Sequence, residues 1–145
     1  MPIIKKISII ILLAGSFYLI AAQPPMATGT DSSQQIADRI TKSKLPVLVD
    51  FWAPWCGPCR LLNPILDTLK IKYKKKVVFM KVNTDVHRQI SAYFNISGIP
   101  AVFIVKDRTV VTSMVGLRTK QEYIDALEAA IKLPPPKAPS DSSRK

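Results

Sequence analysis

Two cysteines separated by two residues are the feature of this chain that could carry chemistry. Cys56 and Cys59 lie in the segment Trp55–Cys59, WCGPC, and the chain has no other cysteine. The segment before them, Val47–Trp52, is apolar, rich in strand-forming residues and too short for a helix, so it predicts a buried strand. After them, apolar residues recur at helical spacing from Leu61 to Leu69. The thiol pair is therefore predicted to lie where a strand ends and a helix begins.

The start of a helix changes the chemistry of a thiol. Free backbone amides there favour negative charge. They can lower the pKa of a cysteine in such a Cys-X-X-Cys motif from about 8.5 to roughly 7. The thiolate is the species that attacks a disulfide. We expect Cys56, at the helix entrance, to be exposed and to attack, and Cys59, within the first turn, to be shielded and to resolve the mixed disulfide. Pro58 fits the first helical turn, where its missing amide costs little.

A close cysteine pair could also have one of three other roles. A zinc site needs four ligands, and the chain offers only one histidine, His87, besides the two cysteines, so this role is excluded. A structural disulfide that closes so small a loop adds little stability on the loop-entropy account. That role and metal delivery by two thiols stay open as alternatives, and redox chemistry is the interpretation that we favour.

The rest of the central region alternates helices and strands. The segment Asp31–Ser33 could cap a helix that contains Ile36 and Ile40, and Thr119 with Glu122 forms a capping-box pattern before a closing helix. Between these helices we predict, in order, the strand Val47–Trp52, the helix after the cysteines, the strand Val77–Asn83, a short helix Asp85–Phe94 and a hairpin from Ala101 to Val115. The order α-β-α-β-α-β-β-α implies a mixed sheet with helices on both faces.

The two ends of the chain are predicted to lie outside this domain, which we assign to residues 33–133. Residues 1–22 begin with basic residues and continue with an uncharged apolar run over residues 7–22. This pattern is typical of a secretory signal peptide, with an uncleaved membrane anchor as the alternative. Either interpretation places the domain outside the cytoplasm, periplasmic or secreted, and in the second it is anchored to the membrane. Residues 23–32 form a linker, and residues 134–145 form a disordered tail rich in proline and serine.

The net charge of +11 raises the question of a nucleic-acid partner. The densest basic cluster is Lys70–Lys76, KIKYKKK, which contains one tyrosine. A nucleic-acid interface would interleave basic residues with several stacking aromatics. We interpret the cluster instead as solvated lysines that complement the dipole at the end of a helix, and we predict no nucleic-acid partner.

Taken together, these motifs resemble the thioredoxin family. The resemblance covers about Ser33 to Leu133. The matching residues are Val49–Cys59 (VDFWAPWCGPC), Pro64, Lys81–Asp85 (KVNTD), Gly98–Pro100 (GIP) and Val115–Gly116. It implies an α/β thioredoxin fold, in which a mixed central sheet of four or five strands is flanked by about four helices.

The resemblance also implies roles for individual residues. Asp50 corresponds to a buried aspartate that assists proton transfer at the resolving cysteine, and burial is expected to raise its pKa. Lys81 corresponds to a lysine near that carboxylate. Pro100 corresponds to a proline that follows a cis bond opposite the cysteines. The implied surface for an extended substrate segment consists of Trp55, Gly57, Pro58, Gly98, Ile99, Pro100, Val115 and Gly116.

Several positions have structural expectations or depart from the family. Trp52, Phe51 and Pro64 are expected to be structural, with Pro64 kinking its helix. The segment Met26–Ser33 is a poor strand, so the first strand of the family is expected to be short or absent. The hairpin turn at Asp107-Arg108 lacks glycine, which disfavours a primed turn, and a different loop is expected.

The function implied by the resemblance is that of a thiol-disulfide oxidoreductase. The Gly-Pro pair between the cysteines resembles the reducing thioredoxins, whose potential is near about −270 mV. We therefore expect a monomeric domain that reduces disulfide-bearing proteins, with a membrane electron-relay donor. We expect no cofactor besides the redox-active Cys56–Cys59 disulfide, and no metal. A non-catalytic binding or chaperone subunit, and a disulfide oxidase or isomerase, are the alternatives.

Overall fold

The computed structural model describes residues 32–134. The predicted leader or anchor over residues 1–22, the linker up to residue 31 and the tail from residue 135 lie outside the described residues. Within the described range, no helix combines the length and the apolar character that crossing a membrane requires.

Four helices and four strands make up the described domain, in the order predicted from the sequence. They are α2 (Ser33–Lys42), β1 (Val47–Trp52), α3 (Gly57–Lys72), β2 (Val78–Asn83), α4 (Arg88–Tyr93), β3 (Ala101–Lys106), β4 (Thr109–Val115) and α5 (Lys120–Lys132). The sheet has the strand order β2-β1-β3-β4, in which β1 and β2 are parallel and the other neighbours are antiparallel. This is the mixed α/β sheet that was expected, in its four-stranded form.

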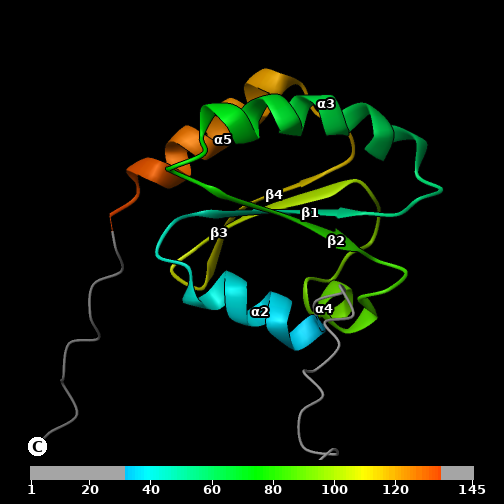
Figure 1. Cartoon of the computed structure of the whole chain (residues 1–145). Coiled ribbons are helices and arrows are strands. Elements are labelled where there is room, and N and C mark those ends of the chain that lie inside the picture. The colour runs from blue at the N-terminus through cyan, green and yellow to red at the C-terminus, as the bar shows by residue number, and fades with distance from the viewer. Residues whose placement is uncertain (1–31, 135–145) are drawn as a thin grey trace, which may run out of the picture. The chain divides into compact units, whose positions relative to one another are not determined.

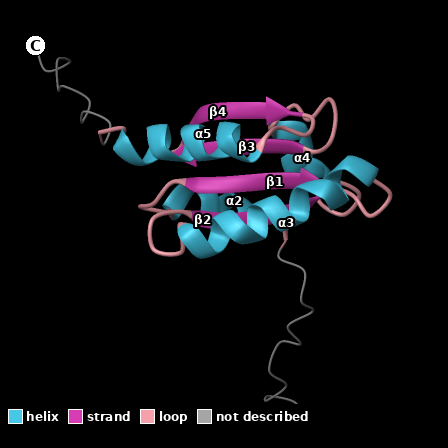
Figure 2. Ribbon diagram, turned by 90° about the horizontal axis from the view of Figure 1, so that it is seen from above, coloured by secondary structure: helices cyan, strands magenta, loops and turns pink. Residues whose placement is uncertain are grey.

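The helices cover both faces of the sheet. Figure 1 shows α3 and α5 on one face and α2 and α4 on the other, and Figure 2 shows the strands from above. The strand β1 is buried on both sides: Leu48 packs with the core beneath α3 and α5, whereas Val49 and Phe51 pack with the core beneath α2 and α4. The strand β1, buried except at its half-buried last residue Trp52, thus leads the chain from the core to the cysteines.

The helix boundaries follow local hydrogen bonds. Thr119 and Glu122 form the predicted capping box at the start of α5. At the start of α2 the cap lies in the predicted segment, at Ser32, and it is a capping box with Gln35, which the sequence analysis had not predicted. The helix α4 is shorter than predicted, because Asn83 holds the preceding residues in a turn: its carbonyl accepts from the amide of His87 at 2.8 Å and its side chain from the amide of Asp85 at 2.9 Å. Pro64 lies inside α3, which the structure assigns as one helix from Gly57 to Lys72.

The β3–β4 turn differs from our expectation. Lys106 pairs with Thr109, and the two residues between them, Asp107 and Arg108, have φ angles of 50° and 67°. Positive φ at both central residues is the mark of the primed turn that the absence of glycine had disfavoured, so that expectation was wrong. Such a turn matches the right-handed twist of the strands, and aspartate tolerates the left-handed region better than most residues. The pairing of β3 with β4, which has one register shift between Ile104 and Val105, outweighs the strain at Arg108.

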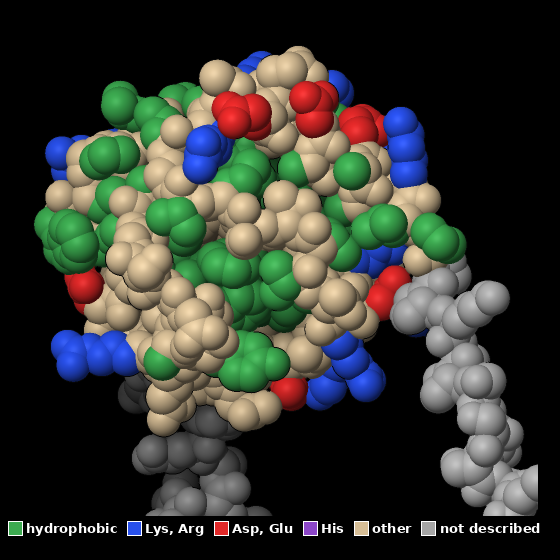
Figure 3. All heavy atoms as spheres, turned by 180° about the vertical axis from the view of Figure 1, so that it is seen from behind, with side chains coloured by type: hydrophobic (Ala, Val, Ile, Leu, Met, Phe, Trp, Pro, Cys, Tyr) green, Lys and Arg blue, Asp and Glu red, His purple; other side chains and the backbone are tan. Residues whose placement is uncertain are grey.

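The strand β4 forms the less covered edge of the sheet. Its residues are exposed or half-buried throughout. A hollow of about 410 Å³ lies between α2, α4 and the hairpin, lined in part by Ala37, Ile40, Phe94 and Val110. Figure 3 shows apolar side chains gathered in the middle of this side of the molecule.

Candidate active site

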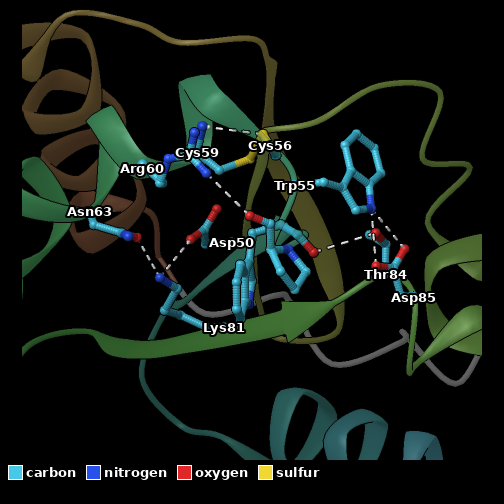
Figure 4. The surroundings of a disulfide bond; sticks show 11 residues. Asp50, Trp55, Cys56, Cys59, Arg60, Asn63, Lys81, Thr84 and Asp85 are labelled. Atoms are coloured by element: carbon cyan, nitrogen blue, oxygen red, sulfur yellow. Dashed lines mark hydrogen bonds and ion pairs between the residues drawn. A yellow bond between two sulfur atoms is a disulfide. The ribbon is translucent and has the colours of Figure 1, made fainter.

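The two cysteines lie where the buried strand passes into a helix, as predicted. The strand β1 ends at Trp52, and Cys56 occupies the N-cap position of α3. The structure holds Cys56 and Cys59 as a disulfide. The backbone amide of Cys59 donates a hydrogen bond of 3.2 Å to the sulfur of Cys56 (Figure 4). The sulfur of Cys56 therefore occupies the place where a helix binds negative charge.

The expected difference in exposure between the cysteines is absent. Cys56 is 3% exposed and Cys59 is 2% exposed, so the expectation of an exposed Cys56 is wrong for this disulfide state. Ala53 is buried together with the pair, and Trp52 and Ile99 pack against this cluster. What distinguishes the two residues is their position on the helix: Cys56 caps α3, while Cys59 lies inside its first turn.

A single buried carboxylate lies behind the disulfide. Asp50, on β1, is 1% exposed, and among the described residues its Oδ1 has no hydrogen-bond partner. Burial disfavours the charged form and raises the pKa of Asp50 to about 6, while the charge of Lys81 lowers it in part. Figure 4 shows the carboxylate between Lys81 and the disulfide. A group with this pKa can accept or release a proton near neutral pH.

Lys81 has two further partners besides Asp50. Its Nζ lies 3.8 Å from Oδ2 of Asp50 and donates to Oδ1 of Asn63 at 2.5 Å. It also lies 5.0 Å from the ring centroid of Trp52. Sequence reasoning missed Asn63. The sequence feature that could have indicated Asn63 is its position: it is a polar residue four positions after Cys59, and therefore on the same face of α3.

The segment opposite the cysteines comes from the start of β3 and the end of β4. The Ile99–Pro100 peptide bond is cis, and Ile99 packs against the cysteine pair. The amide of Gly116 donates to the carbonyl of Pro100 at 2.8 Å, and a Cβ at Gly98 would lie 3.5 Å from Val115. The fold thus brings five of the expected surface residues together although they lie in two separate segments: Gly98, Ile99, Pro100, Val115 and Gly116.

The tryptophan before the first cysteine is held in an exposed position. Trp55 is 69% exposed, and its indole Nε1 donates to the carboxylate of Asp85, with distances of 3.1 and 3.4 Å to the two oxygens. Sequence reasoning missed the part played by Asp85, because it lies 30 residues away, in the turn after β2. Of the other expected surface residues, Gly57 is half-buried and Pro58 is exposed.

The remaining expectations concern residues around the site. Phe51 is fully buried in the core, and Trp52 is half-buried beneath Lys81. His87 is half-buried at the start of α4 and caps it without a side-chain hydrogen bond. Within residues 32–134, no group of three or more histidine, cysteine or acidic side chains is arranged to hold a metal.

Comparisons with known proteins point to one family. Residues 27–129 match the sequence model of the family described as Thioredoxin. The chain is 42% identical over 101 residues to Thioredoxin 1 of a Nostoc species, an alignment that covers 68% of this chain and 91% of the relative. It is 39% identical over 102 residues to a thioredoxin of a Synechocystis species, which covers 70% of this chain and 95% of the relative. A thioredoxin of Rickettsia felis is 38% identical over 102 residues, with the same coverage of both chains.

Proposed function

This chain belongs to the thioredoxin family, and from that premise we propose that it reduces disulfide bonds of proteins outside the cytoplasm. The family and the Cys56–Cys59 pair make it a thiol-disulfide oxidoreductase. The observation that carries the thiol-disulfide exchange itself is the hydrogen bond from the amide of Cys59 to the sulfur of Cys56 at the start of α3. The same contact would stabilise the Cys56 thiolate in the reduced protein.

The reaction transfers two electrons from the dithiol to a substrate disulfide. The Cys56 thiolate attacks one substrate sulfur, the substrate disulfide breaks, and a mixed disulfide forms while the other substrate sulfur leaves as a thiolate. Cys59 then loses its proton and attacks the sulfur of Cys56. The substrate leaves with both sulfurs reduced, and the enzyme keeps the Cys56–Cys59 disulfide, the state that the structure holds.

Asp50 is the proposed acceptor of the proton that Cys59 releases. It is the buried carboxylate behind the pair, and its pKa of about 6 leaves it mostly ionised at neutral pH. Burial makes this ionised form a better base than an ordinary aspartate. Lys81, at 3.8 Å, limits how far the pKa rises and so keeps the base available.

A substrate segment would approach over the apolar surface beside the disulfide. Trp55 and Val115 are exposed there, at 69% and 46%, and Ile99 lies against the cysteines. An extended peptide could pair with the backbone at Ile99 and place its disulfide over Cys56. Side chains of many kinds fit such a surface, which suits an enzyme for several protein substrates.

The direction and the compartment rest on two sequence features. The Gly57-Pro58 pair between the cysteines favours a low potential, near about −270 mV for reducing thioredoxins. The apolar leader over residues 7–22 favours export or anchoring. A reductase in an oxidising compartment needs electrons from the cytoplasm, so we propose a membrane relay as its donor. The cysteine pair itself is the redox group in this proposal.

Two measurements test the proposal. Equilibrium with a glutathione buffer gives the potential of the pair, and a value well above about −200 mV would identify an oxidase or isomerase instead. Reduction of insulin disulfides with dithiothreitol as donor reports the catalytic activity. We expect Cys56→Ser to abolish it, whereas a biological activity that survives Cys56→Ser would identify a non-catalytic binding subunit.

A further inference from the structure

The end of the domain that lies opposite the disulfide is built from four segments that the fold brings together. They are residues 43–46 after α2, residues 70–77 at the end of α3, the hairpin turn at residues 106–109 and residues 131–134 at the end of α5. We call them the basic end. Figure 1 shows the ends of α2, α3 and α5 and the hairpin turn at one side of the sheet, while the loop before α3 lies at the other.

Hydrogen bonds join the four segments to one another, either directly or through residues next to them. The amide of Val78 donates to the carbonyl of Pro46 at 2.9 Å, which ties the start of β2 to the first segment. The hydroxyl of Tyr73 donates to Glu128 of α5 at 2.8 Å. The ammonium group of Lys106 donates to the carbonyl of Ala130 at 3.1 Å and to that of Leu133. The basic end is therefore one continuous surface.

The charge at the basic end is predominantly positive. Among the four segments the only acidic residue is Asp107. The basic residues are Lys44, Lys70, Lys72, Lys74, Lys75, Lys76, Lys106, Arg108 and Lys132. At the catalytic end, by contrast, the loops over residues 84–87 and 116–119 carry one acidic residue, Asp85, and one basic residue, Arg118. An anionic partner would thus be attracted more strongly to the basic end than to those loops.

Exposed aliphatic side chains accompany these lysines. Ile71 is 78% exposed, Leu133 is 44% exposed and Leu45 is 40% exposed, and each lies within one of the four segments. Exposure of aliphatic side chains to water is energetically unfavourable. Complementation of the helix dipole explains the lysines but not the aliphatic residues between them. Aliphatic residues flanked by lysines are the composition of surfaces that settle into the headgroup region of an anionic bilayer.

Nucleic acid fits this end less well than lipid. Non-specific nucleic-acid surfaces combine basic residues with exposed aromatic rings on which bases stack. Tyr73, the one aromatic residue in the four segments, is 2% exposed and hydrogen-bonded to Glu128. The strongly exposed rings of the described domain, Trp55 and Tyr93, lie in other segments.

We propose that the basic end docks on an anionic lipid surface, with its lysines at the headgroups and Ile71, Leu45 and Leu133 at the edge of the acyl region. In this orientation the disulfide and Trp55 face away from the membrane, toward substrates. The docking is separate from the redox reaction and holds whichever direction that reaction takes.

Quenching by lipids that carry bromine on their acyl chains tests the proposal in the full chain. Both natural tryptophans, Trp52 and Trp55, lie at or near the catalytic end, and the leader contains none. Ile71→Trp therefore adds a reporter at the basic end. On vesicles with about one third phosphatidylglycerol, we expect quenching of the added fluorescence in about 0.1 M salt and its loss in about 0.5 M salt, because screening weakens the attraction. Vesicles of phosphatidylcholine alone should give none, whether or not the leader inserts.

Charge reversal at the two ends supplies the matched comparison. In the Ile71→Trp background, we combine Lys74→Glu, Lys75→Glu and Lys76→Glu. Together they should weaken the affinity for anionic vesicles, followed by quenching, at least about a hundredfold, because each lysine near such a surface contributes to binding. The equal charge change at the catalytic end, Arg88→Glu, Arg118→Glu and Lys120→Glu, should leave the effect in place. Circular dichroism and insulin reduction by the lysine variant verify that it is folded.

Four results would overturn the proposal. They are no quenching on anionic vesicles, equal quenching on phosphatidylcholine, equal loss in both charge-reversed variants, and tighter binding to a single-stranded oligonucleotide than to the vesicles. The last result would assign the basic end to nucleic acid.

Discussion

At Asp50 the fold holds an ionisable carboxylate inside an apolar strand, and the energetic cost of its charge can be measured. Its pKa is about 6 in the folded protein, against 3.8 for an unperturbed aspartate. Between these pH values the folded state keeps a proton that the unfolded state has released. The free energy of unfolding therefore falls as the pH rises through this window, by about 2 to 3 kcal/mol in total.

Asp50→Asn should remove that dependence, because the amide carries no charge at any pH in the window. We expect this variant to be more stable than the wild type by about 2 to 3 kcal/mol at pH 7 and nearly equal to it at pH 4. Urea unfolding of the oxidised proteins at both pH values measures the difference. In the reduced enzyme the same substitution should slow resolution by Cys59 near neutral pH, and unchanged kinetics between about pH 6 and 8 would contradict the role of Asp50 in proton transfer.

Asn63 is expected to affect the pKa of Asp50 through Lys81. The lysine donates to Oδ1 of Asn63 at 2.5 Å but lies 3.8 Å from Asp50. In Asn63→Leu, which keeps the size and removes the acceptor, the ammonium group is free to approach the carboxylate and to stabilise its charge. We expect the pKa of Asp50 to fall by roughly half a unit or more, and the pH profile of resolution to move to lower pH.

Carbon-13 chemical shifts of Asp50 in the oxidised protein measure this pKa without interference from the cysteines. Among the described residues, Tyr123 of α5 also interacts with Asp50, and it titrates well above this range. Asp67→Asn, a change of charge at an exposed position of the same helix, is the control and should leave the value unaltered. A pKa that rises or stays constant in Asn63→Leu would refute the coupling.

At the scale of elements, the β3–β4 turn contains strain that a substitution can release. Arg108 has a φ of 67°, in the left-handed region that costs a residue with a Cβ about 1 to 2 kcal/mol. Arg108→Gly removes this cost but adds flexibility to the unfolded chain, so we expect a net gain of about 0.5 to 1 kcal/mol in unfolding free energy. Thr109→Gly, one residue further and inside β4, should instead destabilise the protein. Urea unfolding of both variants checks the signs, and a loss of stability in Arg108→Gly would rule out the primed turn.

At this scale the sequence predicted the helices, strands and caps that depend on local residue patterns. The strand Val47–Trp52, the helix cap within Asp31–Ser33 and the capping box at Thr119 each depend on residues that lie close together in the sequence, and the structure has them where they were expected. The turn at Arg108 was predicted wrongly because strand pairing over the whole hairpin overrides the preference of one residue.

The same distinction between local patterns and distant contacts applies to the candidate site. The position of the cysteines at the strand–helix junction follows from neighbouring segments, and so was predictable. Contacts between segments distant along the chain were not, as with Trp55 and Asp85 or Lys81 and Asn63. The burial of Cys56 was missed because it depends on Ile99, which approaches from a loop some forty residues later.

At the scale of the whole molecule, the domain separates two surfaces with different chemistry. The disulfide, Trp55 and Val115 lie at one end, where Trp55 and Val115 are exposed apolar side chains. The lysines of the basic end lie at the other. Because the sheet holds the two ends apart, a partner bound at the basic end need not compete with a substrate at the cysteines.

The proposed order of attack gives a prediction about the molecule in its cell. In Cys59→Ser, the mixed disulfide that Cys56 forms cannot be resolved from within the enzyme, since the only other cysteine is gone. We expect the full chain with this substitution to accumulate covalent adducts with substrates. Non-reducing electrophoresis should reveal them, reduction should release them, and mass spectrometry identifies the proteins. Adducts that consist of exported or membrane proteins would support the proposed compartment, and cytoplasmic proteins alone would exclude it. The double variant Cys56→Ser with Cys59→Ser is the control and should trap nothing, and adducts that it still forms would show that the attack does not come from Cys56.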